Sequence, residues 1–251
     1  MGNGKWGMKN CFLNDCYNMI MEPILLHIET ATDVCSVALT QGAEVLGVKE
    51  SADGNSHSKN LLPFIDQVLR DNGKTTADLQ GIVVSIGPGS YTGLRIGVST
   101  AKGMAYSLGI PVITASTLES IAQGAKQQAG TCHCDIVPMI DARRMEVFAA
   151  RYDSNMNLLD EVAAVIVDEN AYSELLQKKE VLFCGNGMPK CKELLSQFPN
   201  AHFADFTLSA QYMLPAALKK WEAKDFADTA YFEPFYLKEY VAGKPNVKGL
   251  H

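Results

Sequence analysis

The order of strand-like and helix-like segments constrains the fold of this chain most, because nearly the same order occurs twice. The first half is predicted to contain three strands, a helix, a strand, a helix, a strand and a helix: residues 24–28, 34–39, 43–48, 61–69, 82–86, 94–108, 111–114 and 117–129. The second half is predicted to contain three strands, a helix, a strand and a helix: residues 136–140, 146–152, 162–167, 171–178, 181–184 and 209–221. This alternation predicts an α/β fold with helices covering the sheets, but it does not fix an activity.

Length and charge exclude some classes of function. With 251 residues, of which 47% are hydrophobic, the chain can bury the core of one large or two small domains. The net charge of -6 provides no general basic field, so we expect no strong autonomous binding to nucleic acid. No apolar run is long enough to cross a bilayer. Residues 1–20 show no apolar period, and we expect them to form a flexible appendage to a domain that begins at residue 21.

The cysteines indicate a reducing cytoplasm and no disulfide framework, because their number is odd and their positions are scattered. They lie at positions 11, 16, 35, 132, 134, 184 and 191. The cluster Cys132-His133-Cys134 has no second ligand pair elsewhere that would complete a tetrahedral metal site. We therefore predict no bound metal.

The most distinctive segment is SIGPGSYTGLRIG at residues 85–97, a glycine-rich turn between a predicted strand and a predicted helix. Such a turn can bring backbone N–H groups close to an anion. A phosphate-binding P-loop does not fit, because five residues separate Gly87 from Gly93 and Leu94 follows. The dinucleotide fingerprint would need a glycine where Thr92 stands. An alternative is that the glycines only allow a tight turn and close helix packing.

This segment is similar to the signature of the TsaB/TsaD glycoprotease-like family, and three further stretches resemble that family in the expected order. They are IETAT to AL at residues 28–39, DARRMEVF at 141–148 and PFYLK at 234–238. The resemblance covers about residues 22–240, and the DARR stretch favours the non-catalytic branch of the family. It implies two related lobes of the actin, sugar-kinase and Hsp70 type, which we place at residues 21–132 and 133–251.

The resemblance also bears on catalysis, because the catalytic branch holds a metal through two histidines spaced HxxxH. Thr117 and Ile121 stand at those positions here, so no metal site is implied. His57 precedes a predicted helix, where a histidine is more often a cap or surface residue than a ligand. The charged residues of the DARR stretch allow either acid–base chemistry or an ion-pair network between a strand end and the neighbouring lobe.

Nucleotide binding is weakened by the sequence of the first hairpin. ATP-using relatives of this fold carry glycines there, whereas this chain has ETATD at residues 29–33. Weak candidates for a residual nucleotide site are Thr30, Thr32, Gly185 and Gly187. For Gly185 and Gly187, the alternative interpretation is an ordinary turn between a strand and a helix, and no cofactor is predicted.

The resemblance implies a non-catalytic scaffold for threonylcarbamoylation of the adenosine next to the tRNA anticodon. The implied partners are the catalytic paralogue TsaD and the ATPase companion TsaE, with tRNA reached only through the complex and a homodimer forming when TsaD is absent. The predicted interface residues are Leu61, Leu62, Ile65, Leu69, Thr92, Leu94, Arg95, Val98 and Lys102. For the helix after Gly93, the alternative is that its apolar stripe only covers the protein's own sheet, whereas the apolar residues of 61–69 spread over more than a narrow stripe. Rival functions are a self-sufficient metallopeptidase or ATP-dependent enzyme and a nucleotide-binding regulatory module.

Overall fold

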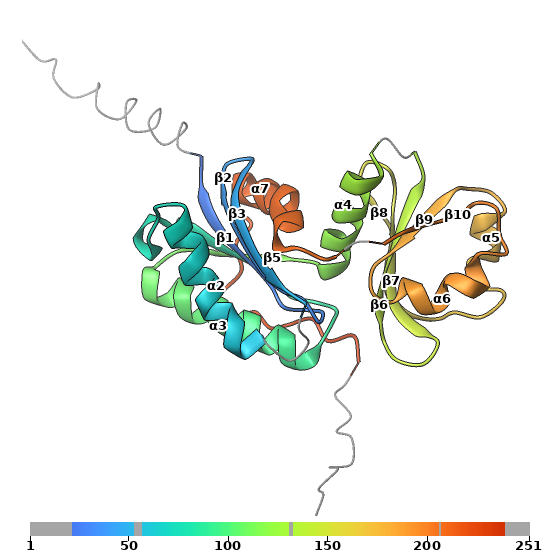
Figure 1. Cartoon of the computed structure of the whole chain (residues 1–251), viewed down its shortest axis with the longest axis horizontal. Coiled ribbons are helices and arrows are strands. Elements are labelled where there is room, and N and C mark those ends of the chain that lie inside the picture. Colours follow the sequence, from blue (N-terminus) through green and yellow to red (C-terminus); the bar gives the residue numbers. More distant parts are fainter. Residues whose placement is uncertain (1–21, 53–56, 131–132, 206, 239–251) are drawn as a thin grey trace, which may run out of the picture.

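Each half of the chain forms a five-stranded mixed sheet, and Figure 1 shows the two resulting lobes. The computed structural model describes residues 22–52, 57–130, 133–205 and 207–238. The first sheet contains β1 (Ile24–Glu29), β2 (Cys35–Gln41), β3 (Glu44–Ser51), β4 (Gly81–Ser85) and β5 (Val112–Ala115). The second sheet contains β6 (Asp135–Asp141), β7 (Glu146–Tyr152), β8 (Leu158–Ile166), β9 (Val181–Cys184) and β10 (Ala201–Ala204).

The strand order is the same in both sheets. It is β3-β2-β1-β4-β5 in the first and β8-β7-β6-β9-β10 in the second. Strand β1 pairs antiparallel with β2 and parallel with β4, and in the second sheet β6 pairs in the same way with β7 and β9. This repetition confirms the predicted α/β fold with two related lobes.

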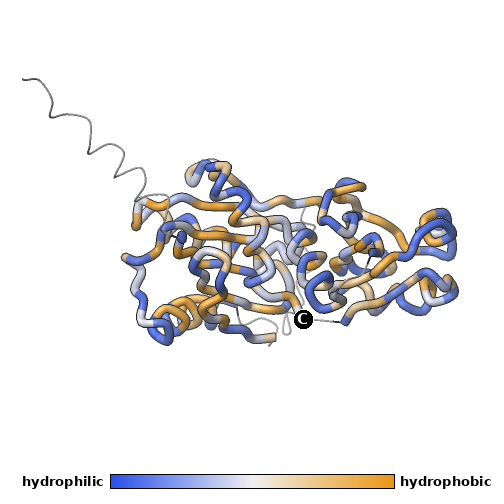
Figure 2. Tube along the Cα trace, turned by 90° about the horizontal axis from the view of Figure 1, so that it is seen from above, coloured by the Kyte–Doolittle hydropathy of each residue, from blue (hydrophilic) through white to orange (hydrophobic). Residues whose placement is uncertain are grey.

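The described helices are α2 (His57–Asp71), α3 (Tyr91–Leu108), α4 (Thr117–Ala129), α5 (Ser173–Leu176), α6 (Met188–Leu195) and α7 (Leu214–Ala223), with 3-10 turns η1 (Thr76–Asp78) and η2 (Ala210–Met213). Figure 2 shows hydrophobic stretches running through both lobes. None of the helices in the described ranges is both long and apolar enough to span a membrane.

The first sheet is covered on both faces. Helices α2 and α3 pack on one face, where Ile65, Val68 and Val98 join the core. The other face carries Leu25 and Val83, and it is covered by residues from the far end of the chain. These covering residues are Ala210, Met213 and Ala217 of η2 and α7.

The second sheet is covered by α4 on one face and by α5 and α6 on the other. Leu118 and Ile121 of α4 pack with Ile136 of β6. Packing therefore exchanges two helices relative to chain order: α4, which ends the first half, belongs to the second sheet, and α7 belongs to the first (Figure 1). The division at residue 132 follows chain order and does not describe these packing units, while the predicted appendage 1–20 lies outside the described residues.

Several predicted elements differ from the structure. The helix predicted over 171–178 is only the single turn α5, because Tyr172 is left-handed with φ 64° and interrupts the helix at its start. The helix predicted over 209–221 begins at Leu214, where Pro215 fits the first turn. Helix α6 and strand β10 were not predicted.

Candidate functional site

The turn that follows β1 packs against the glycine-rich segment and forms hydrogen bonds with it. The backbone N–H of Ser90 donates to the carbonyl of Ala31 over 2.7 Å. The Thr30 hydroxyl donates to the carbonyl of Gly93 over 2.8 Å, and a Cβ at Gly93 would overlap the Thr30 carbonyl oxygen. The glycine therefore permits backbone contact within the lobe, as the packing interpretation predicts. Because the Ser90 N–H is already bonded, it is not available to an anion.

Glu29, at the end of β1, is a buried acid that the sequence reasoning did not single out. Its Oε1 accepts hydrogen bonds from the Ala31 N–H over 2.7 Å and from the Ser85 hydroxyl over 2.8 Å. Its Oε2 has no partner among the described residues. Burial raises the pKa of Glu29 to about 7, although these hydrogen bonds act in the opposite direction. In the sequence, the only indication of this buried acid is a carboxyl residue directly after the apolar run ILLHI.

His57 also holds this turn in place. It is the first residue of α2 and is buried, so of the two expected roles, a cap or a surface residue, the surface position is wrong. The ring Nε2 donates to the Thr32 carbonyl over 2.7 Å. The turn 29–33 thus contacts the first residues of both α2 and α3.

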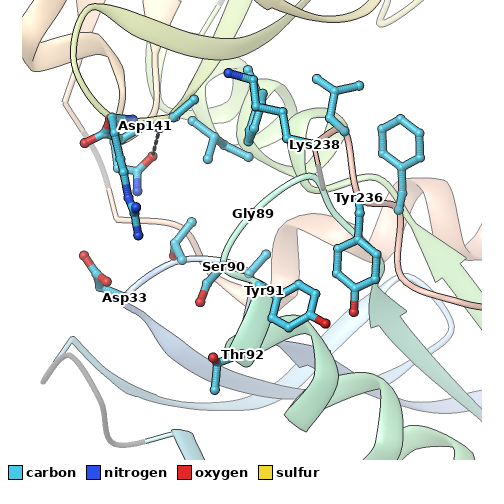
Figure 3. Close-up of a pocket in the computed structure, with 17 residues that line it drawn as sticks. Asp33, Gly89, Ser90, Tyr91, Thr92, Asp141, Tyr236 and Lys238 are labelled. Carbon is cyan, nitrogen blue, oxygen red and sulfur yellow. Dashed lines mark hydrogen bonds between the residues drawn. The ribbon is translucent and has the colours of Figure 1, made fainter. Parts of the chain in front are cut away.

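A pocket of about 620 Å³ lies between the lobes. Its polar lining residues are Thr32, Asp33, Ser90, Thr92, Asp141, Arg143, Asn186 and Lys238. Its aromatic lining residues are Tyr91, Phe148, Phe235 and Tyr236. Figure 3 shows Asp141 and Asp33 on one side of this pocket and Tyr91, Tyr236 and Lys238 on the other.

The charged residues of the DARR stretch form ion pairs around this pocket. Asp141 pairs with Lys190, and Glu146 pairs with Lys238 from the end of the described chain. Partial burial raises the pKa of Asp141, but hydrogen bonds from Lys190 and from the Arg143 N–H outweigh this effect and lower it overall. The geometry thus supports the ion-pair interpretation of this stretch over acid–base chemistry. Its two arginines, Arg143 and Arg144, form the hairpin turn with left-handed φ of 70° and 49°.

The four weak nucleotide candidates have structural roles in the described residues. Thr30 is fully buried, and its hydroxyl donates to the Gly93 carbonyl. The Thr32 hydroxyl accepts a hydrogen bond from the Val34 N–H over 3.3 Å. A Cβ at Gly187 would lie 2.9 Å from the carbonyl carbon of Ile140, and one at Gly185 would overlap the Met139 carbonyl oxygen. Close packing explains both glycines, although Thr32 also faces the pocket.

The two positions at which the catalytic branch carries histidines are occupied by packed side chains. Thr117 and Ile121 are 0% and 1% exposed. Ile121 belongs to the core of the second sheet, and its Cγ2 would lie 3.2 Å from a Cβ at Gly185. Within the described ranges no three His, Cys, Asp or Glu side chains gather, and Cys132 lies outside those ranges.

A second hollow of about 550 Å³ lies between α2 and α3, and we call it the α2–α3 groove. It is lined by His57, Ser58, Leu61, Leu62, Tyr91, Thr92, Arg95, Ile96, Ser99 and Thr100. Of the nine predicted interface residues, Leu62, Thr92 and Arg95 are exposed and Lys102 is half-buried. The other five are buried in their own lobe: Leu61, Ile65, Leu69, Leu94 and Val98. For Leu94 and Val98 of α3, the alternative that the stripe covers its own sheet describes the structure, and Leu61, Ile65 and Leu69 of α2 are buried in the same way.

The two cations among these residues, Arg95 and Lys102, form contacts within the chain. Arg95 Nε donates to the Tyr236 hydroxyl over 3.2 Å, and Lys102 Nζ donates to the Ala230 carbonyl over 3.2 Å. Lys102 also lies 4.6 Å from the centre of the Phe232 ring. Sequence reasoning placed these residues on a partner-binding face and missed their contacts with the end of the chain.

Comparisons with known proteins match most of the chain. The model of the family TsaD, tRNA N6-adenosine threonylcarbamoyltransferase, matches residues 36–239. A protein of Escherichia coli named tRNA threonylcarbamoyladenosine biosynthesis protein TsaB is 31% identical over 226 residues, which cover 88% of this chain and 96% of that protein. The protein of the same name from Bacillus subtilis is 31% identical over 221 residues, which cover 85% and 93%.

A solved structure extends the comparison to the fold. YeaZ from Pseudomonas aeruginosa superposes with a TM-score of 0.75 and 27% sequence identity, covering 86% of this chain and 100% of that one. The TsaD-family match includes the glycine-rich segment, the DARR stretch and PFYLK. The chain therefore belongs to the TsaB/YeaZ proteins of the TsaD family.

Proposed function

We propose that this chain takes part in the formation of threonylcarbamoyladenosine in tRNA as a non-catalytic subunit that binds the catalytic paralogue TsaD. TsaE joins the complex, and tRNA is reached only through it. When TsaD is absent, the same face binds a second copy of the chain. The role in threonylcarbamoyladenosine formation is supported by the names of the relatives that match along most of their length.

The observation that carries the non-catalytic role is the packing at Thr117 and Ile121. In the catalytic branch these positions supply metal ligands, whereas here both side chains are buried and Ile121 completes the core of the second sheet. Ile121, whose side chain contacts the β9–α6 turn, has no donor atom for a metal. The internal hydrogen bond of Ser90 supports the same conclusion for the glycine-rich segment.

The α2–α3 groove is the surface that we assign to TsaD. Leu62 is 61% exposed there, and the edge of the groove carries the cation Arg95. An exposed leucine next to a groove of about 550 Å³ provides the apolar centre that protein interfaces use. Arg95 adds donors at its rim.

Substitution of Leu62 tests this assignment. We expect Leu62→Glu to lower the affinity for TsaD at least about tenfold, because a charge would be buried at the centre of the contact. Thermal stability should change little, since Leu62 contributes little to its own core. Titration calorimetry with purified TsaD, after circular dichroism has confirmed folding, measures the effect. Ile65→Glu is not a usable variant, because Ile65 is 4% exposed and the charge would enter the core.

The matched control is Leu159→Glu. Leu159 is 42% exposed on β8 of the second lobe, so this variant adds the same charge to an exposed leucine away from the groove. Its affinity for TsaD should equal that of the wild type. A folded Leu62→Glu protein that binds TsaD at full affinity would move the interface elsewhere.

A self-sufficient metallopeptidase or ATP-dependent enzyme is the rival function, and the pocket between the lobes is the feature that favours it. With about 620 Å³ it has room for a small ligand. The assay that separates the two functions is turnover by the purified chain alone, compared with the reconstituted system containing TsaD, TsaE and the enzyme that makes threonylcarbamoyl-adenylate. The non-catalytic role requires that turnover appears only in the reconstituted system.

A further inference from the structure

The PFYLK residues 234–238, which we call the strap, contact both lobes. The Phe235 N–H donates to the Ile86 carbonyl over 2.7 Å, directly before the glycine-rich turn. A Cβ at Gly87 would lie 2.6 Å from the Phe235 carbonyl oxygen, so this glycine is needed for the strap to approach. Three residues later, Lys238 pairs with Glu146 of β7 in the second lobe. The strap therefore bridges the lobes.

The strap is also part of the boundary between the groove and the pocket. The Tyr236 ring lies with its centroid 4.9 Å from that of Tyr91, and Figure 3 shows the two rings side by side. Tyr91 lines both hollows, Tyr236 lines the pocket, and Arg95 lines the groove. The Arg95 guanidinium lies 4.1 Å from the centre of the Tyr91 ring while its Nε donates to Tyr236. One cluster of three side chains thus connects the two hollows.

The side-chain contacts of the strap, at Tyr236 and Lys238, are of kinds that a binding partner can replace. Phe235 is 42% exposed, and the side chain of Lys238 is 49% exposed. Solvent-exposed ion pairs and cation–π contacts contribute little each, because water screens both of them. Arg95 is itself exposed, lines the groove and uses one of its five N–H donors on Tyr236.

We propose that the strap couples the α2–α3 groove to the arrangement of the two lobes, with a partner in the groove drawing Arg95 away from Tyr236 and loosening the strap. This inference rests on the proposed function, in which the occupant of the groove is TsaD. The two states are a strap held by Arg95 and Glu146 and a strap released from both. Because coupling between two sites is reciprocal, weakening the strap at its far end strengthens binding at the groove.

Glu146→Gln is the decisive variant, because it removes the ion pair with Lys238 in the second lobe without touching the groove. We expect the affinity for TsaD to rise about fivefold, the lower end of typical coupling between sites. In the free protein, the amide hydrogen of Phe235 should exchange faster in this variant than in the wild type. Saturating TsaD should accelerate the same amide in the wild type. Hydrogen exchange resolved at Phe235 and calorimetry with TsaD provide the two measurements.

The control is Asp160→Asn, which removes an ion pair with Arg151 in the same lobe, away from the strap. It should change neither the exchange at Phe235 nor the affinity for TsaD. If the Phe235 amide exchanges faster in Glu146→Gln but TsaD binding is unchanged or weaker, the Glu146–Lys238 pair only anchors the strap. That result would overturn the coupling. If the wild type does not bind TsaD at all, the proposed function fails instead, and exchange at Phe235 still reports whether Glu146 holds the strap.

Discussion

Glu29 shows how one side chain positions several others in this protein. Its Oε1 holds the Ala31 N–H, and the Ala31 carbonyl in turn accepts from Ser90 at the start of α3. The acid is fully buried, and its second oxygen lacks a partner in the described residues. Desolvation penalises the charged form, so the hydrogen-bonding role is compatible with a carboxyl that remains protonated near neutral pH.

This burial predicts a pH dependence of stability. The folded pKa of about 7 exceeds the ordinary value of 4.5, so between them the folded state holds a proton that the unfolded state has lost. The free energy that Glu29 contributes to folding is therefore fully present below the ordinary pKa, and it is lost as the pH rises through about 7. We expect Glu29→Gln, compared with the wild type, to have a relatively higher melting temperature at about pH 8 than at about pH 5. Melting curves that differ by the same amount at both pH values would contradict this.

Candidate site residues were predictable from sequence only as far as helix periodicity allows. Helical periodicity predicts the apolar stripes that contain Ile65 on α2 and Val98 on α3, but it cannot tell whether an apolar side chain contacts its own sheet or a partner. Burial decides this for Ile65 and leaves Leu62 at the surface. The contact between Arg95 and Tyr236 joins residues 141 positions apart, so no local pattern could indicate it.

At the scale of one element, α3 combines a glycine that must remain glycine with one that need not. Gly93 lies against the Thr30 carbonyl, and the hydrogen bond from the Thr30 hydroxyl fixes this approach. Gly103, ten residues later, has nothing within 4 Å of where a Cβ would be. The same substitution at the two positions therefore separates packing from helix propensity.

Gly93→Ala should lower the free energy of unfolding by about 3 kcal/mol, because the added methyl group would force α3 away from the turn after β1. Gly103→Ala should raise it by about 0.5–1 kcal/mol, because alanine loses less conformational freedom in a helix. Urea unfolding followed by circular dichroism measures both. Equal effects of the two substitutions would mean that the close contact at Gly93 is not a constraint.

Strong local patterns made some elements predictable to the residue. Strand β7 and helix α4 have the predicted bounds. The strand-forming run of β7 and the helical period of α4 both end at distinct turn or capping residues. Strand β10 has the sequence AHFA, which contains no β-branched residue and gives no strand signal. Helix α6 is only eight residues long, with Pro189 in its first turn, so its apolar period is too short to indicate a helix clearly.

At the scale of the whole molecule, the exchange of α4 and α7 between the lobes ties the two halves together. Each helix shows an apolar face in the sequence, but that face does not state which sheet it meets. Leu118 of α4 packs in the second core, while Ala217 of α7 packs in the first. The duplicated order of elements therefore predicts two similar sheets, but it does not predict which helices pack on each sheet.

This exchange predicts which fragment of the chain folds by itself. Residues 22–116 joined to 207–238 by a flexible linker of about fifteen residues restore both covers of the first sheet, including Met213 and Ala217 over Leu25. We expect this fragment to melt cooperatively as a monomer. Residues 22–132, the unit given by chain order, should not, because one face of the sheet and the apolar face of α4 would both be exposed. Thermal melting and size-exclusion chromatography of the two fragments measure the difference, and cooperative melting of 22–132 alone would show that α7 is dispensable for the first lobe.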